Sequence, residues 1–513
     1  MVARPVFVPP LVVGVGIIYL NVVTMSNPRE STMSNPLTND LNTLRQAAES
    51  TATPGRYRQD LHLVPPVGWL NDPNGLCQLG DTYHAYFQYS PFNAEGGVKM
   101  WGHSMSDDLV RWSYEGTALY PDQPFDVSGV YSGCAFVEYG VMHVFYTGNV
   151  KREDEYGYDY VKRGREANTV HVMSEDGFSF GPKQVVMTND DYPADDTEHV
   201  RDPKVWRSGD EYLMVQGARR NDDRGEVLVF SSPDLESWTL CNRVLTDYPF
   251  GYMWECPDYF EVADGGSCAR TSEVKVLSVS PQGLVGSEWD RRNVYQSGYF
   301  VLRGDIHGEC RLSTFALWDA GFDFYAPQTF RANDGRRILI GWMGMPDTKE
   351  YINPTVEDGW QHCFTIPREI TARNDRVLQS PVRELERYRM GEQVATGSLS
   401  HDGARAFDLT VTGIDERGDA LRIEAADELV ITWDNGIFEL RFVNPGKDSV
   451  GAGRKVRFEK LDQLRNVRII GDVSSLEVFV NDGELCFSTR YYPCRYGLSV
   501  EAAGAQISYW DLA

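Results

Sequence analysis

The sequence lacks the paired cysteine spacings that mark disulfide frameworks and zinc sites. Its nine cysteines are an odd number, lie scattered along 513 residues and include no Cys-x-x-Cys pair. Such unpaired cysteines are typical of reduced thiols in a cytosolic protein. We therefore predict a cytoplasmic location, with secretion as the less favoured alternative, and no zinc site.

Positive charge is also scarce. The chain has 49 Lys and Arg against 74 Asp and Glu, which gives a net charge of −25. Because affinity for phosphate backbones and anionic membranes comes from Lys and Arg, nucleic acid and membrane surfaces are excluded as expected partners. The balance favours a neutral or cationic ligand, although a local basic pocket would override it.

Long apolar segments are missing as well. Residues 11–23 are mostly apolar, but a bilayer span needs about 20 such residues. No Ala-x-Ala-like cleavage site follows, and the segment Thr-Met-Ser-Asn-Pro occurs twice, at 24–28 and 32–36. We interpret residues 1–55 as a disordered tail or an over-extended reading frame, in preference to a signal peptide.

Most of the remaining chain shows no helical periodicity. From 56 to 372, short apolar and aromatic strands alternate with turns. A Ser-x-Asp turn followed by an aromatic residue starts at Ser106, Ser174 and Ser232. Repeats of about 60 residues that each hold several strands predict propeller blades. A single β-sandwich is the competing arrangement, but this region is long for one.

A second all-β pattern occupies residues 396–513. Asn435-Gly436 and Asp482-Gly483 are predicted hairpin turns between apolar runs, which indicates a β-sandwich. Before it, a short helix is expected to begin at Ser380-Pro381, because serine suits an N-cap and proline the first helical position. Residues 373–395 are accordingly assigned to a linker.

Three carboxylates stand in aromatic or proline-fixed contexts. They are Asp72 in Trp69-Leu70-Asn71-Asp72-Pro73-Asn74-Gly75, Asp202 in Arg201-Asp202-Pro203, and Glu255 in Trp254-Glu255-Cys256-Pro257. The first motif alone fits a surface turn equally well. Each acid lies just before a strand-like run, so equivalent positions in successive blades would direct all three at one axis. Three acids in one pocket suggest glycoside chemistry.

These motifs resemble the three signature motifs of glycoside hydrolase family 32, the β-fructofuranosidases. Further matches are Trp101-Gly102-His103, Tyr131-Ser132-Gly133-Cys134, Asp323-Phe324-Tyr325-Ala326-Pro327-Gln328 and Ile366-Pro367-Arg368-Glu369. The resemblance covers residues 57–513 and implies a five-bladed β-propeller followed by a C-terminal β-sandwich. It also implies retaining hydrolysis of the terminal β-fructofuranoside of sucrose and short fructo-oligosaccharides through a covalent intermediate, with fructosyl transfer to sugar acceptors as a further outcome.

The resemblance assigns roles to individual residues. Asp72 resembles the nucleophile, Glu255 the general acid/base and Asp202 the transition-state stabiliser. The residues that resemble contacts to fructose or walls of the pocket are Asn71, Gln88, Trp101, Tyr131, Ser132, Arg201 and Trp342. No metal or organic cofactor is expected, because neither proton transfer nor glycosyl transfer here needs one, and an oligomer is compatible with the sequence.

One departure and two alternatives accompany this interpretation. Many family members carry a tryptophan near the position of Gly96, so we expect Phe92 or Met100 to rebuild that wall. A sucrose-6-phosphate hydrolase would need Lys, Arg or His at the pocket mouth. A catalytically silent fructan-binding relative should have lost Asp72 or Glu255, and both are present.

Overall fold

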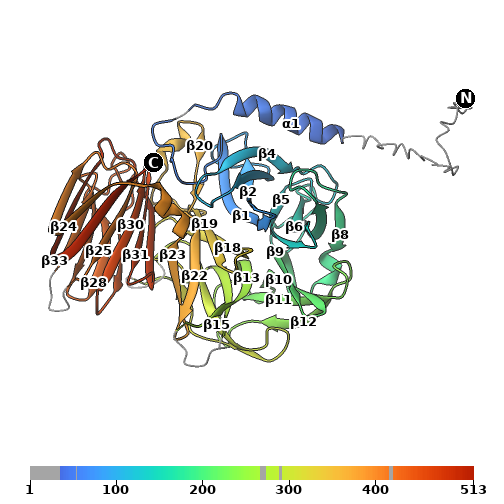
Figure 1. Cartoon of the computed structure of the whole chain (residues 1–513). Helices are drawn as coiled ribbons and strands as arrows, with labels where there is room; N and C mark the ends of the chain where they lie inside the picture. The colour runs from blue at the N-terminus through green and yellow to red at the C-terminus, as the bar shows by residue number, and fades with distance from the viewer. Residues whose placement is uncertain (1–34, 54, 266–272, 288–291, 415–419) are drawn as a thin grey trace, which may run out of the picture.

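The computed structural model describes residues 35–53, 55–265, 273–287, 292–414 and 420–513. As predicted, the protein is nearly all β, and a five-bladed propeller precedes a β-sandwich (Figure 1). Within these ranges, no helix has the length and apolar character needed to traverse a bilayer.

Each blade is an antiparallel sheet whose strands largely follow chain order. The first strands of the blades are neighbours in a closed ring around the propeller axis. The strands are, in blade one, β1 (Gly68–Leu79), β2 (Thr82–Ser90), β3 (Met100–Ser106) and β4 (Ser113–Leu119); in blade two, β5 (Val130–Glu138), β6 (Val141–Lys151), β7 (Arg165–Ser174) and β8 (Gln184–Met187); in blade three, β9 (Asp196–Ser208), β10 (Glu211–Arg220), β11 (Gly225–Ser232) and β12 (Thr239–Val244).

Blades four and five complete the ring. Their strands are β13 (Met253–Ala263), β14 (Glu273–Gln282), β15 (Gly298–Gly304), β16 (Cys310–Leu312) and β17 (Ala316–Leu317) in blade four, and β18 (Tyr325–Arg331), β19 (Arg337–Met343), β21 (Cys363–Phe364), β22 (Arg368–Arg373) and β23 (Arg376–Pro381) in blade five. The late strand β20 (Trp360–Gln361) returns to blade one and pairs with β1 in parallel. Short 3₁₀ helices are η1 (Asn189–Asp191) and η2 (Pro354–Val356).

The three Ser-x-Asp repeats occupy equivalent places in blades one to three, between the third and fourth strands. In each, the serine hydroxyl donates to the aspartate two residues later, at 3.1 Å. The aspartate also accepts backbone N–H bonds from the residues that follow it, which is the Asx-turn pattern. The repeat therefore reports a local turn that closes each of these blades.

Part of the predicted N-terminal tail is a helix. The N-cap residue Asn35 precedes α1 (Pro36–Glu49), and its side chain accepts a hydrogen bond from the Leu37 N–H. An asparagine N-cap followed by proline is a typical signal for the start of a helix. At its other end, Glu49 accepts hydrogen bonds from Tyr114 at 2.6 Å and Tyr89 at 3.1 Å. These contacts of α1 are polar, and the apolar periodicity of the helix is weak. The hydrophobic pattern of the sequence therefore did not predict it. Residues 1–34 of the predicted tail lie outside the described residues.

The predicted linker also differs from the structure. Residues 376–381 form β23, the outer strand of blade five, which pairs with β22. The expected helix begins later, as the 3₁₀ helix η3 (Arg383–Tyr388), and β24 (Arg389–Asp402) follows it at once. Pro381 fits the end of an edge strand, because its missing N–H would face no partner strand there.

The described residues of the sandwich form ten strands, which are drawn in orange to red beside the propeller (Figure 1). They are β24, β25 (Phe407–Thr412), β26 (Leu421–Ala425), β27 (Leu429–Asp434), β28 (Ile437–Phe442), β29 (Val456–Lys460), β30 (Asn466–Asp472), β31 (Ser475–Val480), β32 (Leu485–Arg490) and β33 (Gly497–Leu512). β33 pairs with β26 through its first half and with β25 through its second half. The predicted turns at Asn435-Gly436 and Asp482-Gly483 join β27 to β28 and β31 to β32, with positive φ at all four residues.

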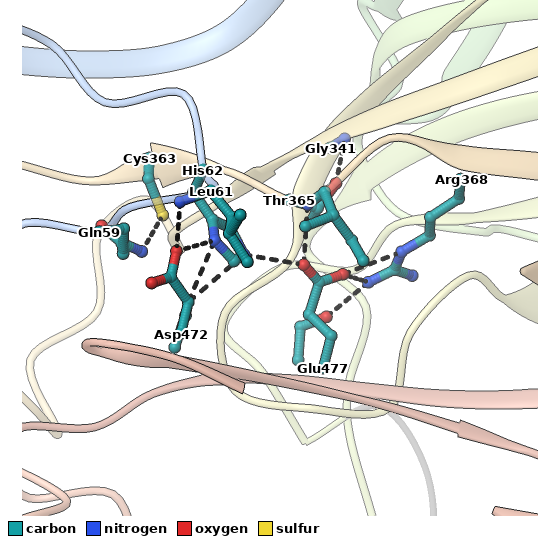
Figure 2. Close-up of polar contacts among 12 residues, drawn as sticks. Gln59, Leu61, His62, Gly341, Cys363, Thr365, Arg368, Asp472 and Glu477 are labelled. Carbon is teal, nitrogen blue, oxygen red and sulfur yellow. Dashed lines mark hydrogen bonds and ion pairs between the residues drawn. The ribbon is translucent and has the colours of Figure 1, made fainter. Parts of the chain in front are cut away.

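A buried cluster of charges joins the two domains (Figure 2). Glu477 of the sandwich accepts from the propeller residues His62, at 3.1 Å, and Arg368, at 2.6 Å. The other ring nitrogen of His62 lies 2.8 Å from Asp472, and Arg368 also contacts Asp319 at 3.2 Å. All five side chains are fully buried. Because both nitrogens of His62 face carboxylates, both must donate, and the ring is an imidazolium.

This arrangement makes the stability of the fold depend on pH. Burial lowers the pKa of His62, but hydrogen bonds and charge attraction from Asp472 and Glu477 outweigh it and raise the pKa from 6.5 to about 9. A raised folded-state pKa stabilises the fold fully below pH 6.5, and the stabilisation is lost as pH rises through about 9. The pKa values of Asp472 and Glu477 are lowered, so their contribution is lost instead on acidification.

We expect the free energy of unfolding of the wild type to fall by about 3 kcal/mol more than that of His62→Gln between pH 6.5 and 9.5. Urea unfolding of both proteins across this range measures the difference. Equal slopes of stability against pH in the two proteins would contradict the imidazolium assignment.

Candidate active site

Every inner strand of the propeller carries a break in its pairing register. The breaks fall at or beside Asp72 on β1, Ser132 on β5, Asp202 on β9, Glu255 on β13 and Tyr325 on β18. All five side chains line one cavity of about 500 Å³ at the centre of the ring, a size typical of small-molecule sites. β-Bulges re-aim side chains in this way next to active sites.

The sequence around the breaks explains their positions. Pro73, Pro203, Pro257 and Pro327 follow within two residues of the cavity-lining side chains of their strands. Proline cannot donate to a ladder and is therefore confined to edges and bulges. On β5 the residue at the register break is Gly133 instead of a proline. A Cβ atom at this position would lie 1.9 Å from the carbonyl oxygen of Phe145.

Asp72 is held by groups from other blades. Its Oδ2 atom accepts a hydrogen bond from Ser132 Oγ at 2.5 Å, and Cys256 Sγ lies 3.7 Å from the same oxygen. Beside it, Asn71 accepts from the indole N–H of Trp69 at 2.8 Å. The carboxylate is thus fixed in orientation but carries no salt bridge among the described residues.

Glu255 is surrounded by donors. Its Oε2 atom accepts from Tyr325 at 2.6 Å and Gln282 at 2.7 Å, and its Oε1 atom is in close contact with Arg201. The Glu255 side chain is 9% exposed. Glu255 is therefore a buried carboxyl at the edge of the cavity, and both of its oxygens have partners. Such a group is suited to proton transfer in a fixed direction.

Asp202 is the most enclosed of the three acids. Its Oδ2 atom accepts from the Cys256 N–H at 2.8 Å, and Arg201 Nε lies at 3.7 Å. Burial raises the pKa of Asp202, Arg201 partly opposes this, and the charge of Asp72 adds to it. Burial, Asp202 and Asp72 also raise the pKa of Cys256 far above its usual value, so the thiol stays protonated and donates weakly between the two carboxylates.

Most of the predicted contact residues line the cavity. Asn71, Gln88, Tyr131, Ser132, Arg201 and Trp342 all belong to its wall. Trp101 does not: it is fully buried, and its indole N–H donates to the backbone carbonyl of Tyr131 at 3.1 Å. Trp101 therefore supports the wall from behind, because β3 places it in the core between blades one and two.

The wall near Gly96 is also built differently from the prediction. Met100 is fully buried and Phe92 is exposed at 47%, and neither lines the cavity. The residues there are Trp69 and Lys99, whose ammonium group lies 5.1 Å from the Trp69 ring. Burial lowers the pKa of Lys99 to about 7, against the raising effect of Asp72.

Several wall residues were not among the predicted site residues. They are Lys99, Tyr160, Val161, His199, Arg219, Tyr252, Gln282, Tyr295, Tyr325, Pro346 and Asp347. Only Tyr325 falls inside a motif that we singled out. Most of the others lie on loops or strand ends between the blades, where no local pattern shows which way a side chain points.

Three carboxylates that line one cavity point to a glycoside hydrolase, because cleavage of a glycosidic bond uses a pair of carboxyl groups that flank it. The models for the Glycosyl hydrolases family 32 N-terminal domain and C-terminal domain match residues 62–381 and 399–511. The chain belongs to glycoside hydrolase family 32, as its motifs indicated.

Relatives of known activity cover most of the chain. Sucrose-6-phosphate hydrolase of Bacillus subtilis (strain 168) is 37% identical over 461 residues, which span 87% of this chain and 91% of that protein. Raffinose invertase of Escherichia coli is 38% identical over 450 residues, with 84% and 89% coverage. The structure of sucrose-6-phosphate hydrolase from Lactobacillus gasseri has a TM-score of 0.81 at 26% identity, with 92% and 96% coverage.

Proposed function

We propose that this protein is a retaining β-fructofuranosidase that releases fructose from the non-reducing end of sucrose and short fructo-oligosaccharides. The observation that supports this best is the convergence of three carboxylates with different partners in one cavity: Asp72 with a hydroxyl donor, Asp202 with a backbone N–H, and Glu255 with three side-chain donors.

In the first step, an oxygen of Asp72 attacks the anomeric carbon C2 of the fructosyl unit. The bond from C2 to the glycosidic oxygen breaks, and Glu255 donates a proton to that oxygen, so the leaving sugar departs as an alcohol. Gln282 and Tyr325 hold Glu255 in place for this transfer. Asp202 offsets the positive charge that develops on the sugar ring.

In the second step, Glu255 removes a proton from water, and the water oxygen bonds to C2 while the ester bond to Asp72 breaks. A sugar hydroxyl in place of the water would give fructosyl transfer. Ser132 and Cys256 lie against Asp72 and would steady it as it alternates between nucleophile and leaving group.

Phosphorylated sucrose is the second candidate substrate. It is supported by the names of the relatives from Bacillus subtilis and Lactobacillus gasseri and by the cationic side chains Lys99 and Arg219 in the cavity wall. An intracellular location agrees with such a substrate and with the eight described cysteines, all of which are free thiols.

Product analysis of the purified protein with sucrose, sucrose 6-phosphate, kestose, raffinose and inulin tests the proposal. We expect fructose from sucrose or its phosphate, and less from long inulin. A folded protein that releases fructose from none of them would contradict the proposed activity and favour a fructan-binding role.

A further inference from the structure

The cavity wall near Asp72 contains an ammonium group without a polar partner. Lys99 lies immediately before β3, lines the cavity and is partly buried. Its Nζ atom makes no hydrogen bond or ion pair with any described residue, and it lies 5.1 Å from the centroid of the Trp69 ring. Because an ammonium group carries three donors and no acceptor, Lys99 has donors that are available to a ligand.

Other lysines of the propeller are paired where they are buried. The side chains of Lys183 and Lys204 are both 10% exposed. Lys183 pairs with two aspartates, at 2.8 and 2.7 Å, and Lys204 pairs with Asp258 at 3.0 Å. Burying a charge costs free energy unless the charge is paired and hydrogen-bonded. The unpaired ammonium group of Lys99 is therefore unfavourable for the free protein, and a ligand that accepts its hydrogen bonds would offset this cost.

Gly96 leaves the ammonium group accessible. A Cβ atom at this position would lie 3.9 Å from Lys99 Nζ and 3.9 Å from Cδ2 of Trp69, so any side chain there would contact both groups. The φ angle of Gly96 is +106°, a conformation that favours glycine. The backbone therefore keeps this side of the cavity free of a side chain that would cover the ammonium group.

Lys99 is also close enough to Asp72 for their charges to interact. Burial lowers the pKa of Lys99 to about 7, the charge of Asp72 raises it, and that of Lys151 lowers it. No ion pair joins Lys99 to Asp72, whose Oδ2 atom accepts from Ser132 instead. A carboxylate that attacks C2 of a fructosyl unit must approach that carbon to about 3 Å, so the hydroxyls of the same sugar come within reach of the ammonium group. A hydroxyl accepts from an ammonium group and can donate to a carboxylate at the same time.

We propose that Lys99 is a substrate-binding residue that donates a charge-assisted hydrogen bond to a hydroxyl of the fructosyl unit beside Asp72. This contact rests on the proposed function, since it assumes a fructoside in the cavity. It assigns Lys99 to the sugar that sucrose, its phosphate and fructo-oligosaccharides share, and not to the leaving group. Hydrogen bonds from a charged donor are stronger than neutral ones, and the Trp69 ring holds the ammonium group in place.

The first test is Lys99→Met, which keeps the length of the side chain and removes its donors. We expect kcat/KM to fall by about 10- to 100-fold on sucrose, and by the same factor on sucrose 6-phosphate, because both carry the same fructosyl unit. Lys151→Met is the matched control. Its Nζ atom lies 5.3 Å from the Tyr160 ring, but Lys151 does not line the cavity, so kcat/KM should change by less than about fivefold.

Thermal unfolding distinguishes binding from a structural role. Methionine in place of Lys99 removes an unpaired, partly buried charge, so Tm of Lys99→Met should equal or exceed that of the wild type. A lysine that supports the fold would instead be needed for stability. A lower Tm in Lys99→Met, together with lost activity, would overturn the assignment to substrate.

Fructose titration measures the contact without turnover, with tryptophan fluorescence as the signal because Trp69 and Trp342 line the cavity. We expect fructose affinity to fall in Lys99→Met and to persist in Lys151→Met. Unchanged kcat/KM and fructose affinity in Lys99→Met, or a loss confined to the phosphorylated substrate, would overturn the contact and leave the hydrolase assignment intact. A wild type that releases no fructose from either substrate, but binds fructose through Lys99, would reject the hydrolase and keep the contact.

Discussion

Asp72→Asn is expected to lower kcat on sucrose or its phosphate by about 10⁴-fold or more, because the amide cannot form the covalent bond to C2. The replacement keeps the size of the side chain and an acceptor for Ser132, so the fold should persist. Steady-state fructose release measures the loss, and circular dichroism checks the fold.

Glu255→Gln distinguishes the two carboxylates. It should lower kcat on natural substrates by about 10²- to 10⁴-fold, since proton donation to the leaving oxygen is lost. A fructoside with a nitrophenol leaving group needs little protonation and should lose much less in the first step, whereas Asp72→Asn should remove turnover of both substrates.

The exposed Asp107→Asn is the control for these variants, and its rates should match the wild type. Wild-type rates in Asp72→Asn, or equal losses on the two leaving groups in Glu255→Gln, would contradict the assigned roles.

Glu477→Ala is expected to lower the free energy of unfolding by about 3–5 kcal/mol, the range for removing one partner of a buried ion pair. Its carboxylate is the common acceptor for His62 and Arg368. Without it, two cations stay buried between the domains with fewer acceptors (Figure 2). Urea unfolding followed by tryptophan fluorescence measures the change.

Glu501→Ala provides the comparison for this interface. Glu501 is exposed on β33 of the same sandwich, and its loss should change stability by less than about 0.5 kcal/mol. Similar stabilities of Glu477→Ala and Glu501→Ala would show that the buried cluster does not hold the domains together.

The motifs on the inner strands could be predicted from the sequence because their causes are local. A proline two residues or fewer after an acid restricts the backbone wherever the segment lies, and a Ser-x-Asp turn closes through bonds within a few residues. Family resemblance added the number of blades. The same local signals failed at α1, whose contacts with Tyr89 and Tyr114 are polar and distant in sequence, and at β23, whose edge position explains Pro381.

The sequence by itself determined the all-β class and the order of propeller and sandwich, and it singled out the three candidate acids, because strand alternation, turn chemistry and proline act over short distances. Only the tertiary structure decided that Trp101 lies behind the wall while Lys99, His199 and Arg219 enter it, and that His62 meets Asp472 and Glu477. Those contacts join residues that are far apart in the chain. They depend on bulges and on the placement of each blade against the next, which no local pattern specifies.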